Sequence, residues 1–105
     1  MFEHKQLEAE KFRKEQERMA LYLVNHYEGV KKIEFMNFLQ NSSTGIWNVD
    51  VIVNEDYYLT LNINDFGGEI DIAEHISQSG GKELDEKSTL TNEKLLNFEV
   101  KYFEK

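Results

Sequence analysis

The chain has 105 residues, of which 40% are hydrophobic, and its formal net charge at pH 7 is −8. This length predicts a single domain, and the apolar fraction excludes a chain that is disordered throughout. Cysteine is absent, which excludes disulfide bonds, thiolate metal sites and cysteine nucleophiles.

The charge is distributed unevenly along the chain. Residues 1–18 carry five acidic and five basic side chains, so the remainder carries the whole negative charge. No lysine or arginine occurs between Lys32 and Lys82. Such a surface repels a phosphate backbone, so we expect no nucleic acid as a partner. It would attract a basic protein or, weakly, a hard cation, although solubility alone is the simpler explanation.

The first part of the chain is predicted to form one long helix. Residues 3–27 contain neither glycine nor proline and consist mostly of good helix formers. Large apolar residues are concentrated in the second half, so we expect Met19–Tyr27 to pack and residues 1–18 to form a charged, solvated helical stalk. A coiled coil is the weaker alternative for the stalk, because apolar residues do not recur over successive heptads. Gly29 is expected to follow the end of the helix.

The pattern of apolar residues then changes to a period of two, which predicts strands. The strands expected from this alternation are Ile33–Leu39, Trp47–Val53, Tyr57–Ile63 and Ile70–Ile76. The turns between them are rich in Asn, Asp, Ser and Gly. Because short turns join strands that are neighbours in the sheet, we expect an antiparallel meander.

The last third of the chain is less regular. Residues 77–92 are polar and are expected to form a long, mobile loop. Residues 95–103 are predicted to form a fifth strand, with a helix capped at Thr91 as the alternative. The fold class is therefore α+β, a long N-terminal helix packed on one face of a four- or five-stranded antiparallel meander sheet. Residues 1–105 form one domain, whose helix-plus-sheet core begins at residue 19.

The expected register places polar side chains together on the sheet face that points away from the helix. The predicted cross-strand neighbours are Asp50 with Thr60, Asn48 with Asn62, Asn62 with Asp71, and Tyr58 with His75. This face is acidic and partly aromatic, and we predict that it binds a partner. The candidate binding residues are Asp50, Tyr58, Asn62, Glu69, Asp71 and His75.

No pattern in the sequence predicts catalysis, a metal site or a cofactor. Asp50 and His75 could form a base with its orienting group, but no nucleophile accompanies them. Residues 62–67 begin like a calcium loop, but Phe66 and Ala73 occupy positions that need oxygen ligands. The Gly-Gly pairs lack a following Lys-Ser/Thr and are interpreted as turns. Trp47 and Phe66 are interpreted as packing residues rather than as ligand anchors.

One resemblance to a known group of proteins is present. It rests on the run Arg18–Leu23, Tyr27, the segment Gly29–Phe35, a glycine-containing turn and a strand ending in Val53-Asn54. This pattern, over about residues 15–76, resembles small extracytoplasmic proteins of Gram-positive bacteria that are catalogued as domains of unknown function. The resemblance implies a cystatin-like helix on a meander sheet, attached to a membrane, and it implies no functional residue.

We expect no membrane attachment through this chain itself. The chain lacks the cysteine of a lipoprotein signal, and its longest apolar run, Met19–Val24, is far shorter than the roughly 20 residues that span a bilayer. An anchor would have to lie in a segment not present in this chain.

We therefore expect a non-catalytic protein-binding module that is extracytoplasmic and tethered through its N-terminus, with a basic protein as partner. A cytoplasmic location stays open. One alternative is an immunity or inhibitor protein that captures a basic toxin or enzyme. Another is a small-ligand-binding domain of cystatin-like or nuclear-transport-factor-like shape, which would need a pocket between helix and sheet.

Overall fold

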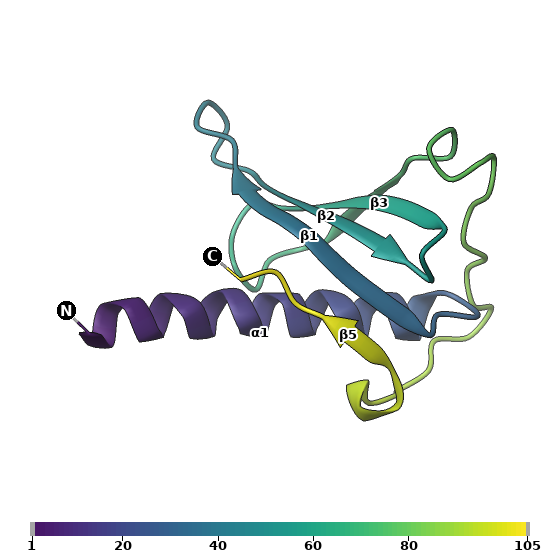
Figure 1. Cartoon of the computed structure of the whole chain (residues 1–105), viewed down its shortest axis with the longest axis horizontal. Coiled ribbons are helices and arrows are strands. Elements are labelled where there is room, and N and C mark those ends of the chain that lie inside the picture. Colours follow the sequence, from purple (N-terminus) through teal and green to yellow (C-terminus); the bar gives the residue numbers. More distant parts are fainter. Residues whose placement is uncertain (1, 105) are drawn as a thin grey trace.

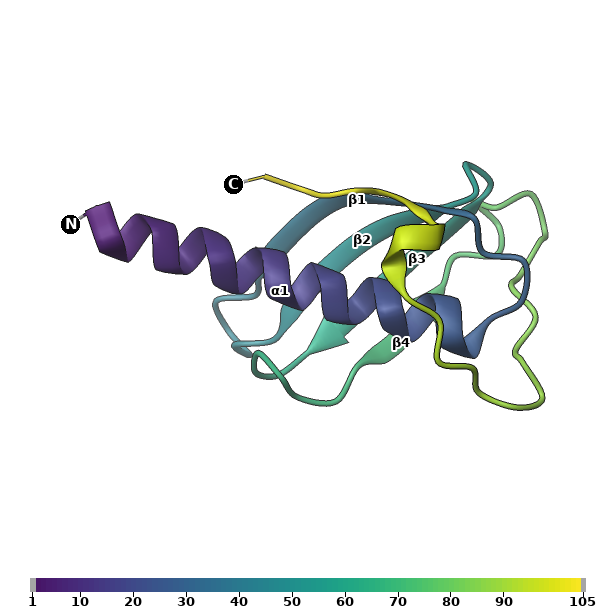
Figure 2. The same cartoon turned by 90° about the horizontal axis from the view of Figure 1, so that it is seen from below.

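A long helix lies across one face of a five-stranded sheet (Figures 1 and 2). The computed structural model describes the backbone of residues 2–104 and the side chains of that range except residues 2–8 and 96. In chain order the elements are α1 (Phe2–His26), β1 (Lys32–Gln40), β2 (Trp47–Val53), β3 (Tyr57–Ile63), β4 (Asp71–Glu74), the short 3₁₀ helix η1 (Leu95–Asn97) and β5 (Glu99–Lys101). The strand order across the sheet is β4-β3-β2-β1-β5. The predicted α+β class is confirmed.

The meander from β1 to β4 is antiparallel, and the register among β2, β3 and β4 is the predicted one. Asp50 pairs with Thr60 across β2 and β3, and Asn62 pairs with Asp71 across β3 and β4. The turn between β2 and β3 has positive φ at Asn54 and Glu55, as the tightest hairpin turns require. Buried and less buried residues alternate in both strands. Together with the turn, this alternation allows only one register that places the apolar side chains of β2 and β3 on the face toward the helix.

The last strand differs from the prediction of an antiparallel meander. β5 pairs in parallel with the first residues of β1, Lys32–Glu34. The chain leaves β4, passes the C-terminal end of α1 and returns along the helix to the far edge of the sheet (Figures 1 and 2). A connection of this length can bring a strand back in either direction, whereas a short turn cannot.

The core lies between the second half of α1 and the inner face of the sheet. The helix contributes Met19, Ala20, Leu23 and Val24, and Tyr27 follows directly after it, all less than 10% exposed. The sheet contributes Ile33, Phe35, Phe38, Val49, Val51, Val53, Leu59, Leu61 and Ile63. The prediction that Met19–Tyr27 packs on the sheet is confirmed.

Packing of the helix begins earlier than the sequence predicts. Phe12 packs against the core, and Glu15 and Gln16 are buried. The interpretation of residues 1–18 as a solvated stalk is therefore wrong from Phe12 onward, because two buried polar residues give no signal in a hydrophobicity pattern. The side chains of residues 2–8 lie outside the described part of the chain.

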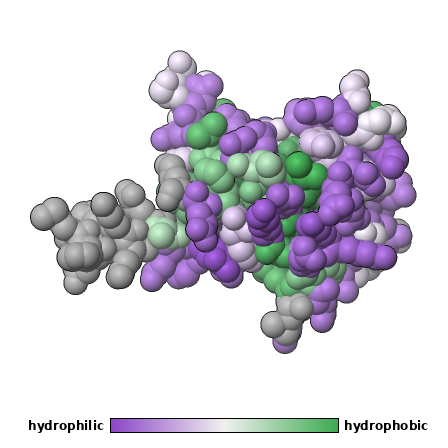
Figure 3. Space-filling model, viewed as in Figure 1, coloured by the Kyte–Doolittle hydropathy of each residue, from purple (hydrophilic) through white to green (hydrophobic). Residues whose placement is uncertain are grey.

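Two strands depart locally from simple alternation. β1 has a bulge between Phe35 and Asn37, which turns Phe35 and Phe38 both inward and leaves Met36 43% exposed. Apolar side chains accordingly gather where β1 and β5 lie, within a mostly hydrophilic surface (Figure 3). β4 ends at Glu74, two residues before the predicted end, and the buried Ser79 bonds to Tyr58 N and His75 O.

The connection between β4 and η1 is irregular, as predicted, but hydrogen bonds hold it against the end of α1. Lys87 Nζ donates to the carbonyl of Val24 (2.8 Å). Asn25 Oδ1 accepts from Thr91 Oγ1 (2.9 Å) and from Glu93 N (2.6 Å). The last carbonyls of a helix have no intrahelical partners, and the C-terminal end of a helix attracts cations. The ammonium group of Lys87 provides both a hydrogen-bond donor and a positive charge at this end.

Candidate functional site

The predicted binding residues lie where the register places them. Asp50, Tyr58 and Asn62 alternate with buried residues of β2 and β3, so their side chains lie on the outer face of the sheet. Asp71 is directly opposite Asn62, and His75 N donates to Tyr58 O. Glu69 is exposed and precedes β4, so it is not part of the paired strands.

A chain of hydrogen bonds crosses the outer face. Asn37 Nδ2 donates to Asp50 Oδ2 (3.2 Å), and Thr60 Oγ1 donates to Asp50 Oδ1 (2.9 Å). The same hydroxyl of Thr60 lies 2.6 Å from His75 Nε2. A hydroxyl has one proton, which Thr60 gives to Asp50, and the tautomer of His75 that carries a proton on Nε2 completes the chain by donating to Thr60. We call Asn37, Asp50, Thr60 and His75 the outer network.

The outer network differs in its hydrogen-bond order from a nucleophile–base pair. In a nucleophile–base pair the hydroxyl proton is directed at an imidazole nitrogen, which a carboxylate orients from behind. Here Thr60 donates its proton to the carboxylate of Asp50, and the imidazole of His75 contacts the same hydroxyl. The arrangement therefore fixes four side chains from successive segments of the sheet on one surface.

A polar hollow of about 370 Å³ lies beside the outer network. Its lining residues are Asn41, Thr44, Ile46, Asn48, Asn62, Ile63, Asn64 and Asp71. Asn48, Asn62 and Asp71 form a row across β2, β3 and β4. Within the described part of the chain, these three side chains form no hydrogen bond, so their amide and carboxylate groups can bond to a ligand.

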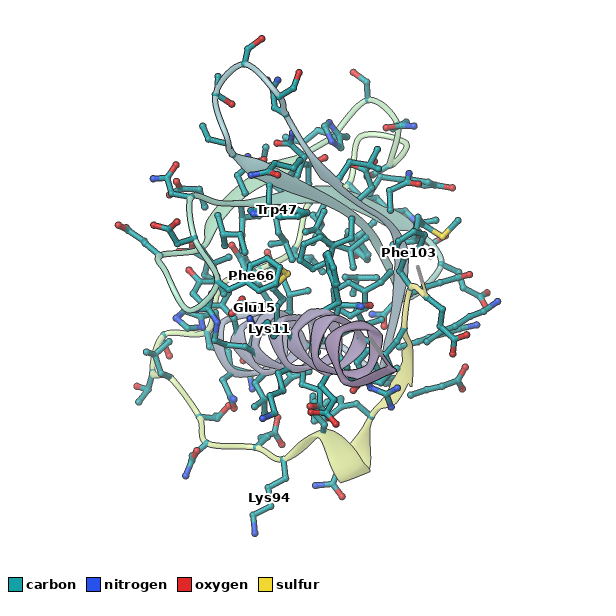
Figure 4. All side chains as sticks on the ribbon, turned by 90° about the vertical axis from the view of Figure 1, so that its left-hand side faces the viewer. Lys11, Glu15, Trp47, Phe66, Lys94 and Phe103 are labelled. Atoms are coloured by element: carbon teal, nitrogen blue, oxygen red, sulfur yellow. The ribbon has the colours of Figure 1, made fainter. Side chains whose placement is uncertain are left out.

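A second concave site lies at one end of the molecule, between α1 and the turn that joins β3 to β4. It has a volume of about 680 Å³ and is lined by Lys11, Phe12, Lys14, Glu15, Trp47, Asp65, Phe66 and Gly67. We call it the aromatic groove. Figure 4 looks onto this end, with Trp47 and Phe66 on the sheet side and with Lys11 and Glu15 on the helix.

Three aromatic rings line the groove, those of Phe12, Trp47 and Phe66, and the ring of Phe38 packs behind them. The rings of Phe12, Phe38, Trp47 and Phe66 all contact one another, with centroids 4.7–5.7 Å apart. Most of these contacts are edge-to-face, which is the arrangement that aromatic quadrupoles favour. Phe38 is fully buried, whereas the other three are partly exposed. Trp47 and Phe66 thus do pack, as predicted, and each also faces the groove.

Glu15 fixes the turn that carries Phe66. It is only 5% exposed, and its carboxylate forms an ion pair with Arg18 (2.8 Å). The same carboxylate accepts a hydrogen bond from the backbone N–H of Gly67. Gly67 has φ of +86°, a conformation that favours glycine. One helix residue therefore holds the β3–β4 turn against the helix across the groove, and no sequence pattern indicates this contact.

Among the described residues, the clear pKa shifts lie outside both concave sites. Burial raises the pKa of Tyr27 and of Tyr102 above the ordinary range of tyrosine. The hydrogen-bonded ion pair between Lys32 and Glu55 raises the pKa of the lysine and lowers the pKa of the glutamate. These shifts concern stability rather than the chemistry of a site.

Neither a metal cluster nor a membrane span is found among the described residues. They contain no group of three or more His, Asp or Glu side chains that could hold a metal ion. No helix among them is long and apolar enough to cross a membrane.

Comparison with known proteins adds no identity to this description. No protein-family model matches the chain, and no curated protein or solved structure is significantly similar to it.

Proposed function

We propose that the protein is a non-catalytic binding domain that recognises another protein through the outer face of its sheet. The observation that carries this proposal is the outer network, which holds polar side chains from four successive segments of the sheet beside a hollow with three unpaired polar groups. Binding groups that are already ordered lose little conformational freedom when a partner arrives.

The charge of this face favours a basic partner. Asp50 and Asp71 lie on it, and the sequence has no lysine or arginine from residue 33 to residue 81. Complementary charge accelerates association more than it strengthens the final complex. We therefore expect association to slow as salt is added, because exposed charges are screened over about 8–10 Å at physiological ionic strength.

The helix supports a tethered arrangement. Its N-terminal end projects past the sheet (Figure 1). Its C-terminal end is bonded to the following loop, because Lys87 donates to Val24 O and Glu93 N donates to Asn25 Oδ1. A projecting helix can space a binding face from an anchor. In this proposal the domain is extracytoplasmic and membrane-associated through a segment that is not part of this chain, as the family resemblance implies.

An affinity capture tests the proposal. The chain is immobilised, and envelope and cytosolic fractions of the source cell are applied to it separately. We expect one dominant, roughly stoichiometric partner from the envelope fraction, released by raised salt. Asp71→Asn should reduce its capture, whereas Asp85→Asn, which removes the same charge from the exposed loop beside the helix end, should not.

Each outcome of the capture is informative. No specific partner from either fraction, or equal capture by Asp71→Asn and the unaltered chain, would contradict the outer face as the binding surface. A partner found only in the cytosol would contradict the proposed location and leave the binding proposal standing. A captured toxin or enzyme that loses activity on binding would identify the domain as an inhibitor.

A further inference from the structure

The aromatic groove has the shape and charge of a small-molecule site, and it lies on a different part of the surface from the outer network. We propose that it binds a hydrophobic anion, namely a free aliphatic carboxylate with a hydrocarbon chain. The hydrocarbon lies against Trp47 and Phe66, and the carboxylate lies at the helix rim beside Lys11 and Lys14. This proposal does not depend on the protein partner proposed above.

The dimensions and lining of the groove suit an apolar body. Its volume of about 680 Å³ lies within the roughly 300–1,000 Å³ range of small-molecule sites. Three partly exposed aromatic rings and the fully buried Phe38 behind them offer a continuous apolar wall. Such a wall favours hydrocarbon over water in proportion to the apolar area that is covered.

The rim of the groove selects the charge of the ligand. Lys11 and Lys14 are three residues apart on α1 and both line the groove, so their ammonium groups lie on the same side. Within the described part of the chain, neither forms an ion pair closer than 4 Å, whereas Lys32, Lys82, Lys87 and Lys101 do. These two cations are therefore available to a ligand in a chain whose net charge is −8.

The acidic groups of the lining do not cancel this preference. Glu15 is engaged by Arg18 and by the N–H of Gly67. Asp65 lies on the opposite rim, in the turn after β3. A carboxylate in the groove is repelled from the turn side and attracted to the helix side, which gives the ligand a defined direction.

The groove is also formed before a ligand arrives. The bond from Gly67 N to Glu15 holds the turn, and the contacts among the four rings hold Phe66 against Trp47, on the side that faces the helix (Figure 4). A wall that does not have to be ordered on binding costs little conformational entropy.

Fluorescence of Trp47, the only tryptophan of the chain, measures occupancy of the groove directly. The whole chain is titrated with octanoate, decanoate and dodecanoate below their micelle concentrations, and with dodecanol and dodecyltrimethylammonium. We expect saturable changes, with affinity rising up to about fourfold per methylene that becomes fully buried. The carboxylate should bind more tightly than the neutral or cationic compound of the same chain length.

Substitutions at the rim separate charge recognition from apolar binding. The double variant Lys11→Gln/Lys14→Gln should weaken dodecanoate binding about tenfold and leave dodecanol binding unchanged. The matched control is Lys31→Gln/Lys94→Gln, which removes two exposed charges elsewhere. Lys94 points away from the groove on the far side of the helix (Figure 4). All four positions are on the surface, so these variants are expected to fold.

Three results would overturn the proposal. One is the absence of a saturable change up to about 1 mM carboxylate, the weak end of small-molecule affinity. Another is equal affinity for the anion, the alcohol and the cation, or no effect of the lysine double variant. The third is a response to vesicles containing phosphatidylglycerol without any response to free dodecanoate, which would assign the groove to a membrane surface. None of these results bears on the protein partner of the outer face.

Discussion

The two described halves of helix α1 contact the rest of the molecule in different ways. The C-terminal half buries Met19, Leu23 and Val24 against the sheet, each at most 1% exposed. The N-terminal half buries one aromatic face and two polar side chains, Glu15 and Gln16. Apolar burial is strong but non-directional, whereas hydrogen bonds fix particular atoms. The C-terminal half therefore supplies stability, and the N-terminal half determines where two other segments lie.

Those two segments are held on different sides of the helix. Glu15 holds the turn that carries Phe66. Gln16 Nε2 donates to Phe103 O (2.9 Å), and Gln16 Oε1 accepts from Phe103 N (2.7 Å), as a neighbouring strand would do. Figure 4 shows Phe103 on the other side from Phe66. The adjacent polar pair thus shapes the groove on one side and fastens the C-terminal tail on the other.

The largest expected effect comes from the apolar half. Leu23→Ala should lower the free energy of unfolding by about 2–5 kcal/mol, because the lost side chain leaves a cavity in a packed layer. Leu21→Ala on the same helix, where the side chain is 37% exposed, should cost less than about 1 kcal/mol. Urea unfolding followed by Trp47 fluorescence measures both. Equal losses would mean that the C-terminal half is not the main source of stability.

The next effect concerns Glu15. Glu15→Ala leaves Gly67 N–H and the Arg18 guanidinium without their partner, and we expect a loss of about 1–3 kcal/mol. Glu10→Ala, an exposed acid on the same helix, is the matched control and should change stability by less than about 0.5 kcal/mol. Hydrogen exchange at Gly67 should accelerate selectively in Glu15→Ala. Unchanged exchange there would show that the turn does not depend on the helix.

Gln16 should produce a smaller loss, of about 1–2 kcal/mol for Gln16→Ala, because only uncharged hydrogen bonds are broken. Gln16→Glu keeps the shape and the acceptor but loses the donor to Phe103 O, so it should also loosen the tail. Hydrogen exchange at Phe103 measures this locally, with Gln40→Ala, an exposed amide that bonds to Gly45 O, as control. A tail that stays protected in both Gln16 variants would assign its position to the packing of Tyr102 instead.

The same contrast explains which features could be predicted from the sequence. The stripe Met19–Tyr27 and the alternation of β2 and β3 are apolar patterns, and they are sufficient for the fold class and for the pairing of Asp50 with Thr60. The outer face could be predicted for the same reason, apart from Asn37, whose place depends on the bulge in β1.

Polar contacts between distant segments could not be predicted. The residues around Glu15 and Gln16 give no local signal of their contacts, since the partners Gly67 and Phe103 lie 52 and 87 positions further along the chain. A charged helix with such residues has the composition of a solvated stalk. The aromatic groove needs the helix, the start of β2 and the β3–β4 turn together, and the direction of β5 depends on a long connection. Each requires tertiary structure that periodicity does not contain.

The smallest expected effect on the free energy of unfolding appears only at alkaline pH. It involves two tyrosines, Tyr27 beside the C-terminal half of the helix and Tyr102 beside the N-terminal half. Burial raises the pKa of Tyr27, and nearby Tyr22, Glu74 and Glu86 raise it further. Burial and Glu17 also raise the pKa of Tyr102, but Arg13, whose guanidinium lies 3.7 Å from the ring centre, opposes the increase. The folded protein therefore keeps these phenolic protons to a higher pH than the unfolded chain does.

This stabilisation is present below about pH 10, the ordinary pKa of tyrosine, and is lost as the pH rises through the pKa of the folded state. The free energy of unfolding should fall between about pH 9 and pH 11, and Tyr27→Phe should make that fall shallower. We expect Tyr102→Phe to have the weaker effect, because Arg13 offsets part of its shift. Tyr58→Phe, on the outer face, controls for loss of a phenol. Tyr102→Phe could instead reduce the alkaline fall in the free energy of unfolding more than Tyr27→Phe does. That result would mean that the contact of the N-terminal half of the helix is more strongly desolvated than the contact of the C-terminal half, which contradicts the comparison made above.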